Sequence, residues 1–271
     1  MSYAYYSKNG IIESIEQANI SLLSVEYSYG FGVYETIRVV KNKALFIDDH
    51  LQRLNTSAKI IDLQHQFTSQ NISKWVYELI DKNEAQTCNI KILLISAEKQ
   101  ENAQLYIFCS QPLFTDRKLY RDGAHLVTYK YEREFPHAKT LNMLQSYLAY
   151  RDAKRNNAYD ALLINRQGYI TEGTRTNIFY LLGKTIVTPP ESHILPGVTR
   201  MHVLEVARTN GFKVEHSNVS LQDLYSADGV FITSTSTKIL PIRSINDSQL
   251  NPFSDELRNL INHFDRFLSD I

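Results

Sequence analysis

Strand-like and helix-like patterns alternate along most of this 271-residue chain, and this alternation limits the fold to one that mixes α and β structure. Residues 32–40 are rich in β-branched and aromatic side chains and run into a polar turn, which predicts a strand paired in a hairpin with residues 44–47. Asp48 or Asp49 is expected to cap the helix that follows and runs through Ile61. Further helices are predicted at residues 73–82, 144–156, 199–210 and 257–267, and further strands at residues 90–96, 105–110, 125–131, 160–182 (a hairpin) and 229–234.

A predicted linker lies near residues 112–120, where Pro112 precedes a charged stretch. We therefore expect an N-terminal α/β domain over residues 1–115 and a C-terminal domain over residues 116–271. A chain of this length has room for two small domains.

The charge balance and the cysteines argue against several classes of protein. Lys and Arg together number 29, as do Asp and Glu, so a protein built to bind nucleic acid or an anionic membrane is not expected. The N-terminus has no secretory pattern, and no apolar run approaches the roughly 20 residues of a membrane helix. Cys88 and Cys109 form no metal-ligand cluster and are expected to be reduced core thiols. We expect a soluble, cytoplasmic protein without a metal site.

Lys139 stands in the segment His137–Asn142, between a predicted strand and a predicted helix. A lysine at such a junction is ordinarily a solvated turn residue. The alternative is an amine nucleophile, which a lysine becomes when it is buried beside a cationic cofactor. The segment alone leaves both interpretations open.

Glu172 ends a predicted strand beside Gly173, an unusual position for a carboxylate unless a cation lies opposite. A structural salt bridge is one explanation. The other is a carboxylate that faces the pyridine nitrogen of a cofactor and keeps the ring protonated as an electron sink.

Two further segments have the character of phosphate-binding loops. Residues 194–200 feed directly into a helix, whose free N–H groups and positive dipole end attract anions, although an ordinary capped helix has the same pattern. Residues 233–237 are a run of Ser and Thr after an apolar strand, which either closes a phosphate cup or forms a plain turn.

Taken together and in this order, these four segments resemble the class IV pyridoxal-phosphate enzymes, a family of branched-chain aminotransferases, D-amino-acid aminotransferases and 4-amino-4-deoxychorismate lyases. The resemblance runs from about Tyr29 to Ile245. It implies pyridoxal 5′-phosphate as the cofactor, with Lys139 as the Schiff-base lysine and Glu172 as the partner of the pyridine nitrogen. The other cofactor ligands that it implies are Arg53, Val198, Thr199, Ser234 and Thr235 around the phosphate and Asn177 behind the cofactor.

The resemblance also implies an α+β fold of type IV, similar to that of D-amino-acid aminotransferase. Such a fold has a small N-terminal α/β domain and a larger C-terminal barrel-like β domain with helices. Members are typically homodimers that act on small-molecule amines, and the same is expected of this chain. In such enzymes the lysine yields its Schiff base to the substrate amine and then acts as general acid and base, a role that falls to Lys139.

Four smaller features bear on the type of reaction. Thr36 stands where branched-chain aminotransferases usually carry a glycine, and the lyases of the family resemble this chain there. Residues 97–102 lack the Arg and His with which D-amino-acid aminotransferases trap the substrate carboxylate. Residues 233–241, in contrast, resemble an aminotransferase, and Phe31 replaces a common acidic residue. We favour the lyase, with a branched-chain or D-amino-acid aminotransferase that uses a 2-oxo acid acceptor as the alternative.

In the lyase interpretation, 4-amino-4-deoxychorismate is converted to p-aminobenzoate and pyruvate, a step of folate biosynthesis. Lys139 removes a proton from the substrate, and Thr36 assists proton delivery. Arg38 is either the ligand of a substrate carboxylate or a structural residue at the end of its strand, and Tyr27 and Tyr29 are candidate walls of the pocket.

An alternative of another class is a non-catalytic relative that keeps the fold for binding. That alternative predicts a lost lysine or lost phosphate ligands. Lys139, Glu172 and Arg53 are all present, which argues against it.

Overall fold

The computed structural model describes residues 3–21, 24–97, 99–112 and 115–271, and the chain separates into two compact units. The first unit holds residues 1–113 and 137–143, and the second holds residues 114–136 and 144–271. This division departs from the expected contiguous domains 1–115 and 116–271, because a short segment of the second half returns to the first unit.

The returning segment, residues 137–143, pairs with strand β3 (Gly32–Val40). The Tyr34 N–H donates to the Lys139 carbonyl at 2.9 Å, and the Leu141 N–H donates to the Gly32 carbonyl at 2.8 Å. Backbone pairing between residues far apart in the chain therefore decides where Lys139 is held.

The expected linker is partly helical. Residues 117–122 form helix α4 (Arg117–Asp122), and the Asp116 side chain caps it. The charged part of the predicted linker is therefore a short helix, because a capping carboxylate precedes it. Leu113 and Phe114 of the linker and Glu98 of the loop 97–102 lie outside the described residues.

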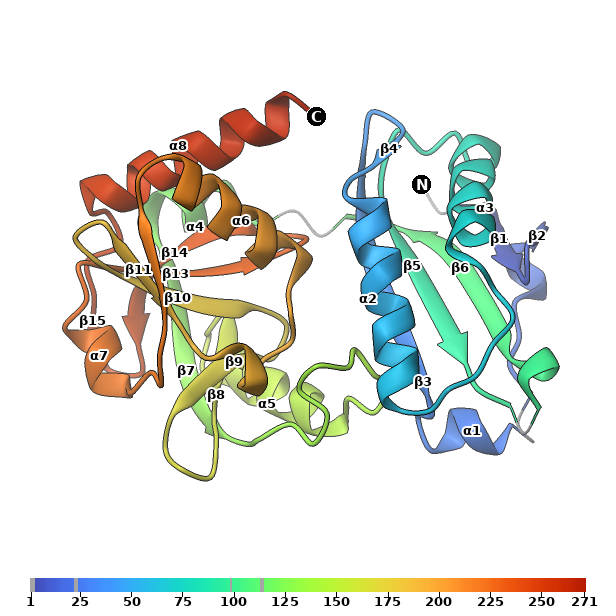
Figure 1. Ribbon diagram of the computed structural model, residues 1–271, viewed down its shortest axis with the longest axis horizontal. Coiled ribbons are helices and arrows are strands. Elements are labelled where there is room, and N and C mark those ends of the chain that lie inside the picture. The colour runs from blue at the N-terminus through green and yellow to red at the C-terminus, as the bar shows by residue number, and fades with distance from the viewer. Residues whose placement is uncertain (1–2, 22–23, 98, 113–114) are drawn as a thin grey trace. The chain divides into compact units, whose positions relative to one another are not determined.

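The first unit is built on a six-stranded antiparallel sheet in the order β2-β1-β6-β5-β3-β4, with helices α2 and α3 on one face (Figure 1). Its elements are β1 (Tyr5–Lys8), β2 (Ile11–Ser14), η1 (Ile15–Gln17), α1 (Val25–Ser28), β3 (Gly32–Val40), β4 (Lys43–Ala44), α2 (Ile47–Ile60), α3 (Ser69–Lys82), β5 (Thr87–Ile95), η2 (Gln100–Asn102) and β6 (Gln104–Ser110).

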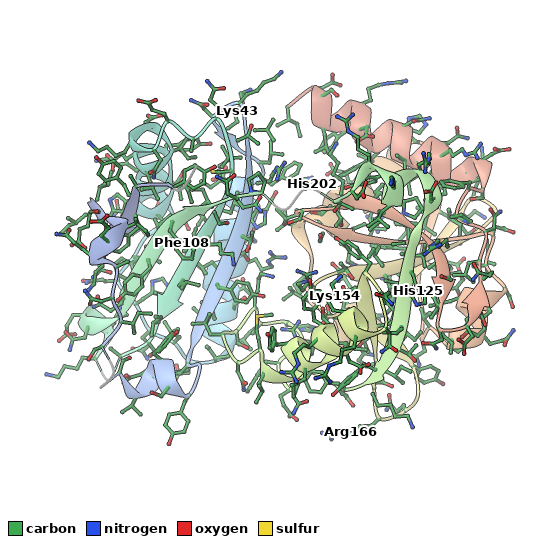
Figure 2. The ribbon with its side chains drawn as sticks, turned by 180° about the vertical axis from the view of Figure 1, so that it is seen from behind. Lys43, Phe108, His125, Lys154, Arg166 and His202 are labelled. Atoms are coloured by element: carbon green, nitrogen blue, oxygen red, sulfur yellow. The ribbon has the colours of Figure 1, made fainter. Side chains whose placement is uncertain are left out.

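Strand β3 shows how this sheet separates core from surface. Its inward side chains are fully buried against α2 in the apolar core of this unit, and the alternate side chains lie on the other face of the sheet. The inward set is Val33, Glu35, Ile37 and Val39, and the outward set is Tyr34, Thr36 and Arg38. Phe108 of β6 also lies on the face turned away from the helices (Figure 2). Glu35 is therefore a carboxylate in an otherwise apolar row.

The hairpin after β3 is tighter than predicted. Lys41 and Asn42 have positive φ values of 50° and 62°, which matches a two-residue turn of type I′, and β4 is limited to Lys43–Ala44. The predicted strand over residues 44–47 is wrong beyond Ala44, because the next turn of chain leads into α2.

Helix α2 begins differently from the prediction. Its N-cap is Phe46, which has a left-handed backbone and makes no capping hydrogen bond with its side chain. The predicted capping role of Asp48 or Asp49 is wrong, since both lie in the first turn, where the positive end of the helix dipole favours carboxylates. Helix α3 begins at Ser69, four residues before the predicted start, because Thr68 caps it.

The second unit contains a nine-stranded sheet in the order β12-β11-β10-β13-β14-β7-β8-β9, with β15 paired to β14. Strand β9 at one end also contacts β10 in the interior of this order, so the sheet curls on itself. Its elements are α4, β7 (Ala124–Lys130), α5 (Leu144–Arg155), β8 (Asp160–Ile164), β9 (Ile170–Gly173), β10 (Asn177–Leu182), β11 (Thr185–Thr188), η3 (Glu191–His193), α6 (Val198–Thr209), β12 (Lys213–His216), α7 (Leu221–Tyr225), β13 (Gly229–Ser234), β14 (Lys238–Ile245), β15 (Ser248–Gln249) and α8 (Asp255–Ser269).

The core of the second unit lies on both faces of this sheet. Ile178, Tyr180 and Ile232 belong to the apolar cluster on one face. On the other face, Phe179 and Phe231 stack at 4.8 Å between ring centroids and pack with residues of α6 and α8. Alternation along β10 and β13 thus presents apolar side chains in both directions, as in a sheet covered on both sides.

Among the described residues, no helix is both long enough and apolar enough to cross a bilayer.

Candidate active site

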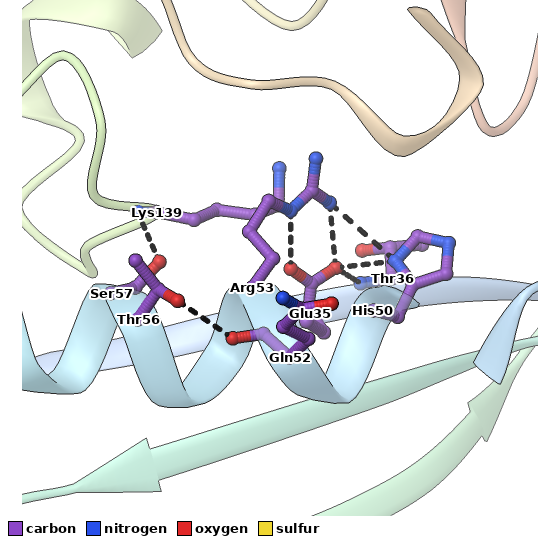
Figure 3. A network of polar contacts seen from close by, with 8 residues as sticks. All are labelled: Glu35, Thr36, His50, Gln52, Arg53, Thr56, Ser57 and Lys139. Carbon is purple, nitrogen blue, oxygen red and sulfur yellow. Dashed lines mark hydrogen bonds and ion pairs between the residues drawn. The ribbon is translucent and has the colours of Figure 1, made fainter. Parts of the chain in front are cut away.

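A fully buried carboxylate organises the polar groups of the first unit (Figure 3). The Arg53 Nε donates to Glu35 Oε1 at 2.7 Å, and Arg53 Nη2 donates to Glu35 Oε2 at 2.8 Å. His50 Nδ1 lies 2.8 Å from the same Oε2, and the Thr36 N–H donates to it at 3.2 Å. His50 and Arg53 are three residues apart on α2, so one face of the helix meets Glu35 of β3.

The charges of this network follow from burial and pairing. Burial by itself raises the pKa of the Glu35 carboxyl, but the Arg53 charge and the hydrogen bonds from His50 and Arg53 hold that pKa well below its usual range. Burial lowers the pKa of His50 more than the Glu35 carboxylate raises it. The imidazole is therefore neutral near pH 7, with its proton on Nδ1 facing the carboxylate.

Lys139 is held against the same helix by its backbone. Its N–H donates to Ser57 Oγ at 3.1 Å, and Ser57 lies four residues after Arg53 on α2. The Lys139 Nζ lies 4.5 Å from the centroid of the Tyr34 ring, on the face of β3 opposite the core. Within the described residues, Nζ makes no ion pair and no hydrogen bond, so the amine is not committed to a structural partner.

The other candidates in the first unit are less tightly held. Thr36 lies two residues from Tyr34 on β3, so its side chain is on the same face as the Lys139 amine. Arg38 follows on that face and donates from Nη1 to Asn89 Oδ1 at 3.4 Å. Tyr27 in α1 is 48 % exposed and Tyr29, just after it, 79 %.

In the second unit, Glu172 is nearly buried at the end of β9, and both of its carboxylate oxygens are engaged. Arg133 Nη1 donates to Oε1 at 3.0 Å, and the Leu195 N–H donates to Oε2 at 3.1 Å. A carboxylate with two such donors keeps a defined orientation.

Asn177, at the start of β10, holds the same loop from its other side. Its Nδ2 donates to the Leu195 carbonyl at 2.9 Å, so the N–H and C=O of Leu195 are both satisfied by site side chains. A Cβ added to Gly197 would collide with Asn177 Oδ1, which explains the glycine before α6. This packing fixes the approach to the first turn of α6, where Val198 and Thr199 are buried.

A second buried carboxylate shapes the turn between Glu172 and Asn177. Asp160 Oδ1 accepts from Thr174 Oγ1 at 2.5 Å, and its Oδ2 accepts from Thr176 Oγ1 at 3.0 Å. Asp160 is fully buried in β8, so the turn is anchored to the interior of the sheet.

Ser234 is the last residue of β13, next to the first residue of β10, and Thr235 begins the turn that follows. Ser234 Oγ accepts from the Thr237 N–H at 3.2 Å, which makes a hydroxyl-stabilised turn. Two buried polar atoms in this region, Thr233 Oγ1 and Arg200 Nε in the first turn of α6, have no partner among the described residues. Buried polar atoms without partners are rare, and they fit a region whose hydrogen bonds are completed by a bound group.

Several residues of these networks were not among the sequence-based candidates. His50, Arg133 and the backbone of Leu195 carry no pattern of their own. Glu35 does carry one, because a carboxylate between Val33 and Ile37 interrupts the apolar side of a strand and requires a buried cation.

A family model described as Amino-transferase class IV matches residues 32–245. The chain belongs to this family. The matched range includes all four segments of the sequence-based resemblance, and that resemblance is confirmed. Pyridoxal 5′-phosphate, the expected cofactor, is typical of class IV aminotransferases.

The class IV relatives cover almost the whole chain. D-alanine aminotransferase of Bacillus licheniformis is 29% identical over 249 residues, which are 88% of this chain and 87% of that protein. The structure of the branched-chain aminotransferase of Thermoproteus uzoniensis with norvaline is 27% identical, with a TM-score of 0.88, over 98% of this chain and 95% of that chain. The structure of a Legionella pneumophila protein named as a candidate 4-amino-4-deoxychorismate lyase is 22% identical, with a TM-score of 0.85. The match covers 93% of this chain and 96% of that chain.

These likenesses confirm the expected α+β fold of type IV, with a small N-terminal α/β unit and a larger C-terminal unit whose sheet curls. The preference for the lyase is not supported. The names of the relatives favour aminotransferases, and a likeness at 22% identity shows the fold alone.

The residues present fit pyridoxal phosphate. The first unit supplies a guanidinium at Arg53 and an amine at Lys139 that has no ion pair within the described residues. The second unit supplies an oriented carboxylate at Glu172 and a helix start near the two buried polar atoms that lack described partners. An amine for the aldehyde, a carboxylate for the ring nitrogen and donors for a phosphate are the groups this cofactor requires.

Proposed function

We propose that this protein is a pyridoxal-phosphate-dependent aminotransferase that moves an amino group from a small amino acid to a 2-oxo acid. The observation that carries the proposal is the state of Lys139. Its backbone is held by Ser57 and by pairing with β3, while its Nζ lies over the Tyr34 ring without an ion pair among the described residues. Lys139 is partly exposed, and an amine that is held by its backbone but makes no ion pair can act as a nucleophile.

The remaining roles follow from the family pattern and the local contacts. Lys139 Nζ would carry the cofactor, and Glu172 would face its ring nitrogen. Arg53, the amides of Val198 and Thr199 and the Ser234–Thr235 turn would hold the phosphate, with Asn177 fixing the loop before α6. The bound cofactor supplies an electron sink for the carbanion of the substrate. Lys139 Nζ would take the proton from the substrate α-carbon and return it.

Two measurements test this proposal. Borohydride treatment of cofactor-loaded protein, followed by peptide mapping, is expected to leave a pyridoxyl adduct on Lys139 and none in Lys139→Ala. A panel of L- and D-amino acids with 2-oxoglutarate or pyruvate is expected to yield new amino acid. Absence of the adduct from cofactor-saturated protein would favour the non-catalytic alternative and refute the proposal.

The second candidate function is the 4-amino-4-deoxychorismate lyase of folate biosynthesis. The observation that favours it is the hydroxyl of Thr36, on the same face of β3 as Tyr34 and the Lys139 amine, where it is available for proton delivery. Arg38 on that face is the candidate for a substrate carboxylate, with Tyr27 and Tyr29 as pocket walls. Formation of p-aminobenzoate and pyruvate that is lost in Lys139→Ala and slowed in Thr36→Gly, without amino transfer, would decide for the lyase.

The homodimer and the cytoplasmic location expected from the resemblance stay predictions. Light scattering tests the first, since a dimer has twice the 31.3 kDa mass of the chain. Fractionation of the source cells tests the second.

A further inference from the structure

Glu35 accepts more hydrogen bonds than are needed to bury one side chain of a strand. Its Oε2 receives three donors, from Arg53, His50 and the Thr36 N–H, and its Oε1 receives the Arg53 Nε. A buried ion pair of this kind adds little stability compared with apolar side chains of the same volume. Its presence in the middle of an apolar row therefore points to a role in orientation rather than in stability.

We infer that Glu35 is the positioning residue of the phosphate subsite, where it fixes the plane of the Arg53 guanidinium for an incoming phosphate group. The inference rests on the proposed function, in which Arg53 binds the cofactor phosphate, and it states how the Arg53 side chain is oriented for that role. Glu35 itself does not contact the cofactor in this assignment.

The geometry of the pair supports this role. Glu35 uses the edge of the guanidinium formed by Nε and Nη2, and both hydrogen bonds are short and parallel. A side-on pair of this type fixes the orientation of the planar fork, so Nη1 points away from the carboxylate. An arginine without this clamp would have to order its flexible side chain at the moment of phosphate binding.

His50 completes the arrangement without adding charge. It lies against Oε2 with Nδ1, and it is neutral because burial and the nearby Arg53 and Lys139 charges oppose its protonation. The neutral His50 ring and Arg53 both donate to the Glu35 carboxylate, so the positive charge of this network is on the Arg53 guanidinium. The phosphate dianion would then meet an oriented positive charge.

The test compares ligands that differ only by the phosphate. Dissociation constants for pyridoxal 5′-phosphate and for pyridoxal are measured by absorbance and fluorescence on apoprotein of wild type, Glu35→Gln, Arg53→Gln and the double variant. Glu78→Gln on the exposed face of α3, which removes a surface pair with Lys74, is the matched control. The melting temperature of each apoprotein reports folding separately.

We expect Glu35→Gln to weaken binding of the phosphorylated ligand about 10- to 100-fold, the range of a charge-assisted hydrogen bond, and to leave pyridoxal binding at the wild-type value. In the Arg53→Gln background, the added Glu35→Gln change is expected to have no further effect on the preference for the phosphorylated ligand. Equal weakening of both ligands, or an unchanged preference in Glu35→Gln, would overturn the inference.

Glu35→Gln leaves the Arg53 charge buried without its partner, and the variant risks misfolding. The double variant removes both charges and Glu35→Asp keeps the carboxylate on a shorter arm, so the comparison remains available. Glu35→Asp is expected to weaken only the phosphorylated ligand, and a uniform loss there would also overturn the inference. Failure of the proposed function is distinct, since wild type would then form no adduct at Lys139.

Discussion

The backbone N–H of Lys139 donates a 3.1 Å hydrogen bond to the hydroxyl of Ser57, 82 residues earlier in the chain. Ser57 lies on the face of α2 that also carries Arg53, so one helix holds both the proposed cofactor lysine and the proposed phosphate arginine. The relative positions of these two ligands are thus set by a single rigid element.

Removal of the Ser57 hydroxyl tests this arrangement. Ser57→Ala leaves the Lys139 N–H without its acceptor and is expected to cost about 1 kcal/mol of unfolding free energy. Hydrogen exchange is expected to quicken in the peptide that covers residues 137–143. Thr56→Ala is the control, because the hydrogen bond of the Thr56 hydroxyl among the described residues stays within α2, to the Gln52 carbonyl. Equal exchange in both variants would contradict the assigned role of Ser57.

The carboxylate of Glu172 is expected to be needed for chemistry rather than for attachment of the cofactor. Glu172→Gln keeps the acceptor for the Leu195 N–H on one atom but loses the negative charge that would keep the ring nitrogen protonated. We expect kcat to fall at least about 100-fold while the borohydride adduct on Lys139 still forms. Full activity in this variant would show that the ring nitrogen has another partner.

Gly197 is expected to be sterically required. Gly197→Ala would bring a Cβ against Asn177 Oδ1, so we expect a loss of about 1–3 kcal/mol of unfolding free energy in urea titrations. Asn177→Ala removes the colliding atom, and the double variant is expected to be more stable than the sum of the two single changes predicts. Strict additivity would mean that the collision is relieved elsewhere.

Asp160 is expected to act on the site through the turn that it anchors. Asp160→Asn weakens the hydrogen bonds to Thr174 and Thr176, so we expect a loss of about 1–3 kcal/mol of unfolding free energy and weaker cofactor binding. Asp228→Asn is the control. Asp228 also anchors a turn, because it accepts from the N–H of Gly183, which lies between β10 and β11. Weaker cofactor binding in both variants would indicate a general effect of stability.

The pH dependence of folding is expected to report His50. Its pKa in the folded protein is lowered from 6.5, so the unfolded chain binds the proton first as the pH falls. The free energy of unfolding should therefore decrease below about pH 6.5, by at most about 1.4 kcal/mol per pH unit for this residue. His50→Asn is expected to flatten the slope, as is His65→Asn, because burial also lowers the pKa of His65. A slope unchanged in His50→Asn would contradict a neutral buried imidazole.

Elements with a strong local pattern are predictable from the chain alone. The strand over residues 229–234 has the predicted bounds, and the last helix carries its apolar stripe inward through Leu257, Leu260 and Phe264. Residues two or four apart determine such periodicity, so the information is contained in a short stretch of sequence. The ordered set of motifs around Lys139 and Glu172 was likewise sufficient for the family.

Start points of helices are less predictable where backbone conformation replaces a capping side chain. Asp48 and Asp49 lead to the prediction that one of them is the N-cap of α2. The N-cap is instead Phe46, which has a left-handed backbone conformation. The tight turn at Lys41 and Asn42 and the pairing of β4 leave the chain no room for a longer strand. Tertiary constraints of this kind override local capping preferences.

The sequence thus determined the alternation of strands and helices and the enzyme family, and it marked Lys139 and Glu172 as the candidate cofactor residues. Only the folded chain decided that residues 137–143 belong with β3, that Arg53 is clamped by Glu35, and that Leu195 joins Glu172 to Asn177. Each of these contacts links residues far apart in the chain, and the need to satisfy buried charges and backbone groups selects the partner. Local periodicity contains no information about which distant group that will be.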